Sequence, residues 1–303
     1  MKQTSIPQAG LYNPAFEKDS CGFGLIAHID NKPSHWLVKT SIDSLARLTH
    51  RGAVAADGKS GDGCGLLLKT PETFLRAKAE TLGVTPAPVF AVGMVFLHRE
   101  EAKALKAKAT LVKEIEKEGL TVLTWRTVPT NTDACGAQSL ATLPSIEQIY
   151  VDAADGMDSS TLDRHLYIAR RRAEKAIEKD DEVFYVASLA SNVISYKGLV
   201  MPENLSVFYP DLGDETLESS QCVFHQRFAT NTFPQWRLAQ PFRFLAHNGE
   251  INTIQGNRNW AQARSYTFET PLIPNMDDIR PWVSSSGSDS NSMDNMVDGL
   301  IAG

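Results

Sequence analysis

Short apolar runs that suit β-strands alternate along this chain with segments in which apolar residues recur at helical spacing. The runs are rich in β-branched and aromatic residues and are bounded by Gly, Pro, Asn or Ser, which is typical of strands. They cover residues 22–29, 89–97, 122–128, 144–151, 183–186, 194–200 and 222–225. We expect 22–29 to be buried. We expect 183–186 and 194–200, which Ser191-Asn192 separates, to pair as antiparallel strands.

Four segments have the spacing of amphipathic helices. Two of them begin with a pattern typical of a capping box, Thr40-x-x-Asp43 and Ser160-x-x-Asp163. The predicted inward faces are Ile42, Leu45 and Leu48; Leu105, Ala109, Val112 and Ile115, within 101–118; Leu162, Leu166, Ala169, Ala173 and Ile177; and Met293, Met296, Val297, Leu300 and Ile301. Arginines 170–172 stand beside acidic residues on the third helix, which indicates a solvated face.

Neighbouring strands without a helix between them favour an α+β layered fold over a doubly wound sheet. We find no repeat or linker that would divide the chain. The glycine-dense stretch 57–65 predicts a loop that is mobile or covers a substrate. Because a domain rarely ends on an apolar stripe, the final helix leads us to expect that the fold is incomplete at its C-terminus.

Composition narrows the class of protein. The chain has 303 residues, 42% hydrophobic and 22% charged, with a net charge of −6, which argues against a nucleic-acid-binding surface. No apolar run reaches the length of a membrane span, and residues 1–20 lack the apolar middle of a secretory signal, so we expect a cytoplasmic protein. The four cysteines have no Cys-x-x-Cys spacing and predict free thiols rather than disulfides or a zinc site.

Two polar segments, 225–232 and 247–253, contain many of the candidate catalytic and binding residues. Arg227 follows a β-prone run, from which its guanidinium could bind a carboxylate with two parallel hydrogen bonds. Asn248-Gly249 combines a side-chain amide with an unshielded backbone N–H, the donors that an oxyanion requires. Asp289 could accept from a ligand's ammonium group, or residues 287–290 could simply cap the last helix. With the thiol of Cys21, these groups suggest acyl transfer on an amino-acid side chain.

Several segments of the sequence together resemble a known enzyme family. The segments 21–24, 50–52, 225–230, 247–250 and 287–290 occur in the order found in class II glutamine amidotransferases, which are N-terminal-nucleophile enzymes. The sequences of segments 21–28, 57–67, 233–256 and 288–296 are similar to the start of glutamate synthase large subunits. The resemblance covers essentially the whole chain. It implies a four-layer αββα fold, with 1–20 as a leader or propeptide and 21–303 as one amidotransferase domain, truncated at its C-terminus.

The resemblance also implies roles for individual residues. Cys21, exposed as the first residue by removal of the leader, would attack the glutamine side-chain amide, with its own α-amino group as base. Asn248 and Gly249 would hold the oxyanion. Substrate-binding roles are implied for Arg227 at the α-carboxylate and Asp289 at the α-amino group, and more loosely for three neighbours, Thr230, His247 and Arg51.

Other parts implied by the resemblance lie beyond this segment. Full-length glutamate synthases carry FMN and a 3Fe-4S cluster, and their downstream synthase domains combine the released ammonia with 2-oxoglutarate. No cofactor is expected in residues 1–303. Expected partners are L-glutamine and those downstream domains, and the resemblance allows a small reductase subunit; neither nucleic acid nor membrane is expected. Two alternatives stay open: another N-terminal-cysteine amidohydrolase, and an inert or structural fragment.

Overall fold

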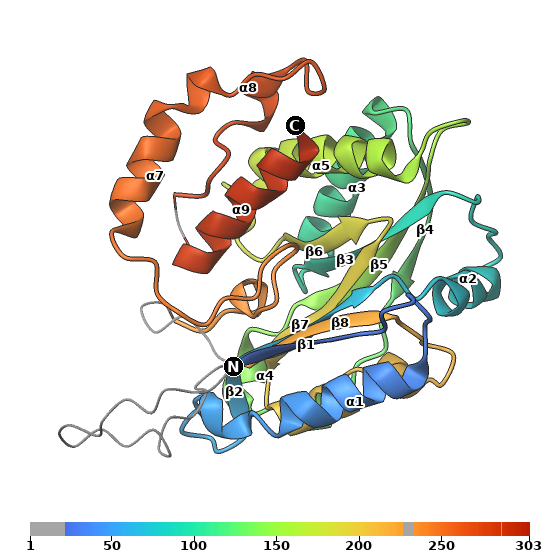
Figure 1. The fold of residues 1–303 in the computed structure, drawn as a ribbon, viewed down its shortest axis with the longest axis vertical. Helices are drawn as coiled ribbons and strands as arrows, with labels where there is room; N and C mark the ends of the chain where they lie inside the picture. Colours follow the sequence, from blue (N-terminus) through green and yellow to red (C-terminus); the bar gives the residue numbers. More distant parts are fainter. Residues whose placement is uncertain (1–21, 227–232, 286) are drawn as a thin grey trace, which may run out of the picture.

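The computed structural model describes residues 22–226, 233–285 and 287–303 (Figure 1). Two four-stranded antiparallel sheets form its centre. The first sheet has the order β1 (Phe23–Ala27), β8 (Gln221–Gln226), β2 (Ser60–Lys69) and β7 (Val193–Val200). The second has the order β4 (Thr121–Thr127), β5 (Ser145–Asp152), β3 (Phe90–Leu97) and β6 (Tyr185–Ala190).

Helices cover the outer faces of both sheets (Figure 1). Helix α1 (His35–Ala46) lies on the first sheet, and α3 (Glu101–Lys117) and α5 (Ser159–Ile177) lie together on the second. The remaining α-helices of the described residues are α2 (Glu72–Thr81), α4 (Ala137–Ala141), α6 (Leu205–Phe208), α7 (Ile254–Ala263), α8 (Met276–Ile279) and α9 (Asp289–Ala302). This arrangement confirms the predicted α+β class and the αββα order of layers.

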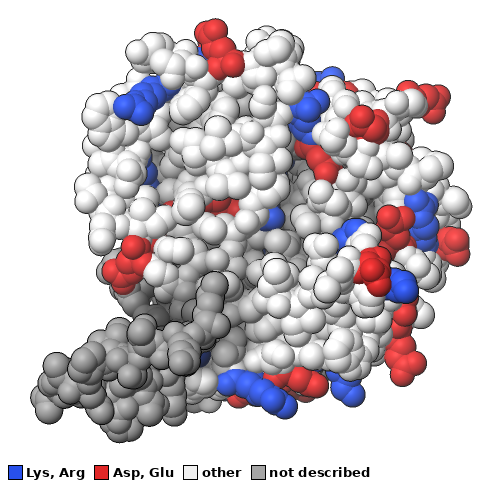
Figure 2. All heavy atoms as spheres, viewed as in Figure 1, with Lys and Arg blue, Asp and Glu red and all other residues white. Residues whose placement is uncertain are grey.

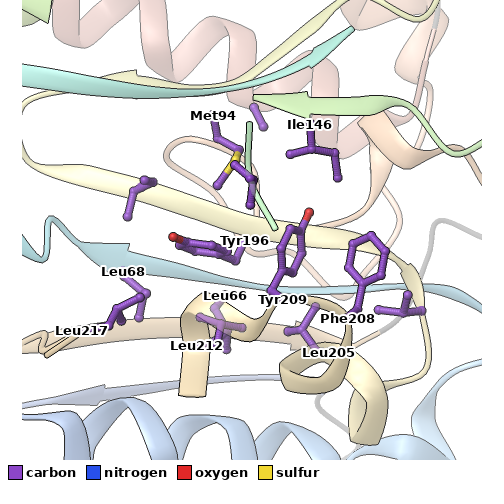
Figure 3. Packing of buried hydrophobic residues seen from close by; sticks show 14 of the residues in the cluster. Leu66, Leu68, Met94, Ile146, Tyr196, Leu205, Phe208, Tyr209, Leu212 and Leu217 are labelled. Atoms are coloured by element: carbon purple, nitrogen blue, oxygen red, sulfur yellow. The ribbon is translucent and has the colours of Figure 1, made fainter. Parts of the chain in front are cut away.

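Two apolar cores hold the layers together. The larger core contains residues of both sheets and of α1 and α2, and within it Tyr196 of β7 lies with Tyr209, Phe208 and Leu66 (Figure 3). Tyr196 and Tyr209 pack edge to face with ring centroids 5.2 Å apart. The second core joins the outer face of the second sheet to α3 and α5. On the face drawn in Figure 2, acidic and basic side chains are interspersed.

The predicted strands at 89–97, 122–128, 144–151 and 222–225 are confirmed with small shifts at their ends. The predicted pairing of the two strands around Ser191-Asn192 is wrong, because β6 pairs with β3 and β7 with β2, in different sheets. Ser188 of β6 still contacts β7 through the Ser195 N–H, at 3.1 Å. The link at 191–192 is therefore a crossing from one sheet to the other. An apolar run carries no information about which distant strand will be its partner.

Two further predictions, one of a strand and one of a loop, need correction. The run 22–29 is not fully buried: β1 is an edge strand whose burial alternates, and Leu25 is 63% exposed. The stretch 57–65 is a loop only up to Lys59, because β2 begins at Ser60. Gly61 in this stretch permits close packing, since a Cβ there would lie 2.5 Å from the Val200 carbonyl oxygen.

Both predicted capping boxes lie inside their helices. Ser34 caps α1 by accepting from the Leu37 N–H, and Asp158 caps α5 by accepting from the Thr161 N–H at 2.7 Å. The inward face predicted for α5 is confirmed, with Leu162, Leu166, Ala169, Ala173 and Ile177 all buried. Arg170, expected in solvent, is only 2% exposed.

The inward faces predicted for α3 and α9 are only partly right, with Ile115 of α3 buried and Met296 of α9 packed against an apolar cluster that includes Ile168 of α5. In α3, Leu105 is 57% exposed, and Ala107, Leu111 and Ile115 form the buried face. In α9, Leu300 and Ile301 point outward and the polar side is buried. That polar side meets buried charges of the neighbouring elements, which compensate Asp294 and Asp298.

Candidate active site

The candidate site lies where the chain enters β1 and leaves β8, at the same end of the first sheet. Three predicted site residues, Cys21, Arg227 and Thr230, lie outside the described residues. Their described neighbours are paired: the Gln226 N–H donates to the Gly22 carbonyl oxygen at 2.6 Å, and Phe23 stands opposite His225 in the ladder. Antiparallel pairing therefore brings two segments that are 202 residues apart in the sequence together at one edge of the first sheet.

Asn248 lies against the start of β1. A Cβ on Gly22 would be 2.8 Å from Asn248 Oδ1 and 2.3 Å from the Gln226 carbonyl oxygen. Only glycine permits so close an approach of the two backbones and the amide. Gly249 follows on the exposed side, and within the described ranges no acceptor is hydrogen-bonded to its N–H. Asn248, one of the two predicted oxyanion donors, thus lies beside Gly22, the residue that follows Cys21, and Gly249 is the next residue along the chain.

His247 is held by several hydrogen bonds. Its N–H donates to Gln240 Oε1 at 2.8 Å, and its carbonyl oxygen lies 3.0 Å from Gln240 Nε2 and 3.1 Å from His225 Nε2. Its ring Nδ1 is 3.0 Å from the Ser290 hydroxyl, at the beginning of α9. The backbone that leads into Asn248 is therefore fixed both to the first sheet and to α9.

Asp289 connects α9 to the same segment. Its Oδ2 accepts from the Ile251 N–H at 2.6 Å, and its Oδ1 accepts from the Ser290 N–H. Ser288 caps the helix by accepting from the Asn291 N–H at 3.1 Å, so the capping interpretation of 287–290 is confirmed. Asp289 Oδ1 also accepts from the Ser290 hydroxyl at 3.2 Å, and the two carboxylate oxygens have lone pairs beyond these three bonds, which leaves Asp289 able to accept from a ligand as well.

Arg51 lies near this end of the sheet, in the segment that precedes β2. It ends the 3-10 turn Thr49–Arg51, and a Cβ on the following Gly52 would overlap Gln226 Nε2, at 1.6 Å. The Ala53 N–H donates to Asp62 Oδ2 at 2.9 Å, which ties this loop to β2. The described structure therefore brings Arg51, His247, Asn248, Gly249 and Asp289 to one region.

Gln240 contacts this region and was not predicted from the sequence. It is 3% exposed, and both ends of its amide are bonded to residue 247. Nothing in the local sequence distinguishes it from any other glutamine, because its role depends on where the chain folds back. His225 and Ser290 lie within the segments that we had singled out, yet we had assigned them no role.

The cysteines of the described residues are unsuited to nucleophilic chemistry. Cys64, Cys135 and Cys222 are buried free thiols. Burial raises the pKa of Cys64 well above its usual value, that of Cys135 to about 11 and that of Cys222 to about 12. A thiol with so high a pKa is protonated at neutral pH and does not act as a nucleophile. The free-thiol prediction is thus confirmed for these three.

The described residues contain no group of three or more His, Cys, Asp or Glu side chains that could hold a metal ion. Across the same residues, no helix combines the length and the apolar character needed to span a bilayer.

Comparison with known proteins agrees with this geometry. The sequence profile of the class-II glutamine amidotransferases matches residues 21–303. The chain is 44% identical over 302 residues to the glutamate synthase [NADPH] large chain of Azospirillum brasilense, covering 98% of this chain and 20% of that protein. It is 40% identical over 304 residues to the corresponding chain of Bacillus subtilis, covering 99% and 20%.

A third relative is the ferredoxin-dependent glutamate synthase 1 of Arabidopsis thaliana, 40% identical over 298 residues, which are 97% of this chain and 18% of the relative. The chain thus spans about a fifth of the length of these relatives. The family match, in contrast, extends over nearly all of the chain and includes every element that forms the candidate site. The chain belongs to the class-II glutamine amidotransferase family.

Proposed function

We propose that this chain hydrolyses L-glutamine to L-glutamate and ammonia, as the amidotransferase part of a glutamate synthase. The observation that carries the proposal is the placement of the Asn248 side chain beside Gly22, because that residue is bonded to the proposed nucleophile, Cys21. The high pKa of each of the other three cysteines supports the choice of Cys21.

In the proposed reaction the Cys21 thiol transfers its proton to the α-amino group that removal of residues 1–20 exposes, and the sulfur attacks the side-chain amide carbon. The tetrahedral oxyanion accepts from the Asn248 side-chain amide and the Gly249 N–H. The ammonium group returns the proton to the leaving nitrogen, the C–N bond breaks, and ammonia departs. Water then hydrolyses the thioester, which releases glutamate and regenerates the thiol.

The substrate contacts belong to the same proposal. Arg227 binds the α-carboxylate and Asp289 the α-amino group of glutamine, which selects a free amino acid by its two charged ends. Thr230 and His247 line the site, and Arg51 belongs to a loop that closes over it. The position of Asp289 beside Ile251, two residues after Gly249, supports its part in this set.

We further propose that the ammonia passes to synthase domains of a longer polypeptide, which hold FMN and a 3Fe-4S cluster and use 2-oxoglutarate. A small reductase subunit is a further proposed partner, and the cytoplasm is the proposed location. The supporting observation is the similarity to glutamate synthases that are about five times as long as this chain.

The test compares glutamine hydrolysis by two forms of the protein, one beginning at Met1 and one processed to begin at Cys21, as verified by intact mass. We expect activity only in the processed form, and Cys21→Ala should lower its rate by a factor on the order of 10³ or more. Cys135→Ala, which removes a buried thiol elsewhere, is the control and should retain the rate. Full activity of the Met1 form, or a preference for simple amides over glutamine, would contradict the proposal.

A further inference from the structure

Gln240 holds the backbone of His247 from both sides. Its Oε1 accepts from the His247 N–H at 2.8 Å, and its Nε2 donates to the His247 carbonyl oxygen at 3.0 Å. We propose that Gln240 is a positioning residue that fixes the Asn248–Gly249 segment in the geometry needed for the oxyanion. This inference rests on the proposed function, because it deepens the role of the same site.

The contact has the pattern of a hydrogen-bonded pair in an antiparallel sheet, with a side-chain amide in place of the second strand. The peptide bond that follows His247 is planar, so its carbonyl direction sets the plane that contains the Asn248 N–H. The orientation of that plane determines where the Asn248 Cα and the next N–H, that of Gly249, can lie. A small rotation at His247 therefore displaces both proposed oxyanion donors.

Gln240 is itself held by the first sheet. A Cβ on Gly65 of β2 would lie 2.9 Å from the Gln240 carbonyl oxygen, and the neighbouring Ala239 is similarly close to Gly63. Gly65 stands opposite His225 in the β2–β8 ladder, and His225 Nε2 is the second group near the His247 carbonyl oxygen, at 3.1 Å. The groups that hold His247 thus come from a buried part of the rigid scaffold, which is the arrangement that a precise site requires.

The chemistry of the contact needs a donor and an acceptor on the same short side chain. Glutamine provides both in fixed geometry. A glutamate, when ionised, would keep an acceptor for the His247 N–H but place a second oxygen against the His247 carbonyl oxygen. A methionine has similar length and provides neither group.

The test measures kcat and KM for glutamine in the processed full chain and in its Gln240→Met and Gln240→Glu variants. We expect kcat to fall by about 10- to 100-fold in both variants, less than for complete loss of an oxyanion donor, with KM changed less than about threefold. The control is Gln148→Met, because Gln148 is also a buried glutamine whose amide bonds two side chains, Arg126 and Tyr196. It should lower the melting temperature and leave kcat unchanged.

Amide hydrogen exchange gives a readout that does not depend on activity. The His247 N–H should exchange faster in Gln240→Met than in the wild type or in Gln148→Met. If the wild type does not hydrolyse glutamine, the proposed function fails, whereas the exchange rate still tests the contact. If the wild type is active and a folded Gln240 variant keeps its kcat, or raises only KM, the positioning role is wrong.

Discussion

Gly22 shows that the close contacts at the candidate site depend on a single residue. The end of β8 and the side chain of Asn248 both approach it closely enough to exclude a Cβ. In the sequence it is one glycine of twenty, although the resemblance included it in a motif with Cys21. Its physical role, which is to allow close contact of β1 with the end of β8 and with the Asn248 side chain, became visible only in three dimensions.

We predict that Gly22→Ala destabilises the protein by about 1–3 kcal/mol and reduces glutamine hydrolysis, because the new methyl group would lie 2.3 Å from a backbone oxygen. Urea unfolding and a glutamine assay measure the two effects. Gly213→Ala is the matched control, since no atom lies within 4 Å of its Cβ position, and it should change the stability by less than about 1 kcal/mol. A Gly22→Ala protein of normal stability and rate would show that the contact is not required.

At the scale of elements, helix α3 shows where periodicity is insufficient. Its apolar residues occupy more than one face, so the sequence permits several inward stripes. Packing against the second sheet and α5 buries Ala107, Leu111 and Ile115. Leu105, which we had predicted to face inward, remains exposed.

This difference predicts opposite outcomes for one substitution at two positions of α3. Leu111→Ala should lower the free energy of unfolding by about 2–5 kcal/mol, because it removes fully buried atoms and leaves a cavity. Leu105→Ala should change it by less than about 0.5 kcal/mol, since that side chain is 57% exposed. Denaturant titration of both variants gives the comparison. Equal losses at the two positions would favour the stripe that we first predicted.

At the scale of the whole molecule, a buried ionic cluster joins α5, the segment after Gln240, and α9. Arg170 of α5 bonds both Glu174, at 2.9 Å, and Asp298 of α9. Arg243 Nε donates to the same Asp298 carboxylate at 3.0 Å. This cluster explains why α9 buries its polar side, and it ties the helix that carries Asp289 to the second layer of helices.

Asp298→Asn should destabilise the protein by about 3–5 kcal/mol, because it leaves the buried guanidinium groups of Arg170 and Arg243 without their shared carboxylate. Thermal unfolding followed by circular dichroism measures this loss. The control is Asp277→Asn, which breaks an ion pair whose carboxylate is 89% exposed and should cost less than about 1 kcal/mol. Similar effects of the two substitutions would argue against a structural role for the cluster.

The cluster also predicts a loss of stability in acid. Burial by itself would raise the pKa of Glu174, but the charges of Arg170, Arg171 and Arg243 lower it from 4.5 to about 2. Because the folded state then binds fewer protons than the unfolded state, the contribution of Glu174 is complete above about pH 4.5 and is lost as the pH falls towards 2.

Urea unfolding at several pH values between 7 and 2 checks this dependence. The stability difference between the wild type and Glu174→Gln should be largest near neutral pH and should shrink between pH 4.5 and 2. A difference that stays constant over that range would mean that the carboxylate of Glu174 titrates normally in the folded state.

The sequence by itself determined most of the strands, the four longest helices, the α+β class, and the order of the segments that form the candidate site. These features depend on local periodicity or on motifs, so they can be predicted from the sequence alone. The tertiary structure alone decided that β6 and β7 belong to different sheets, that α9 turns its polar side inward, and that Gln240 holds His247. The reason is physical: a strand's partner, the environment of a helix face and the acceptor of a buried amide all belong to other parts of the chain. Arg170 and Asp298 are 128 positions apart in the sequence, and only folding brings their charges together.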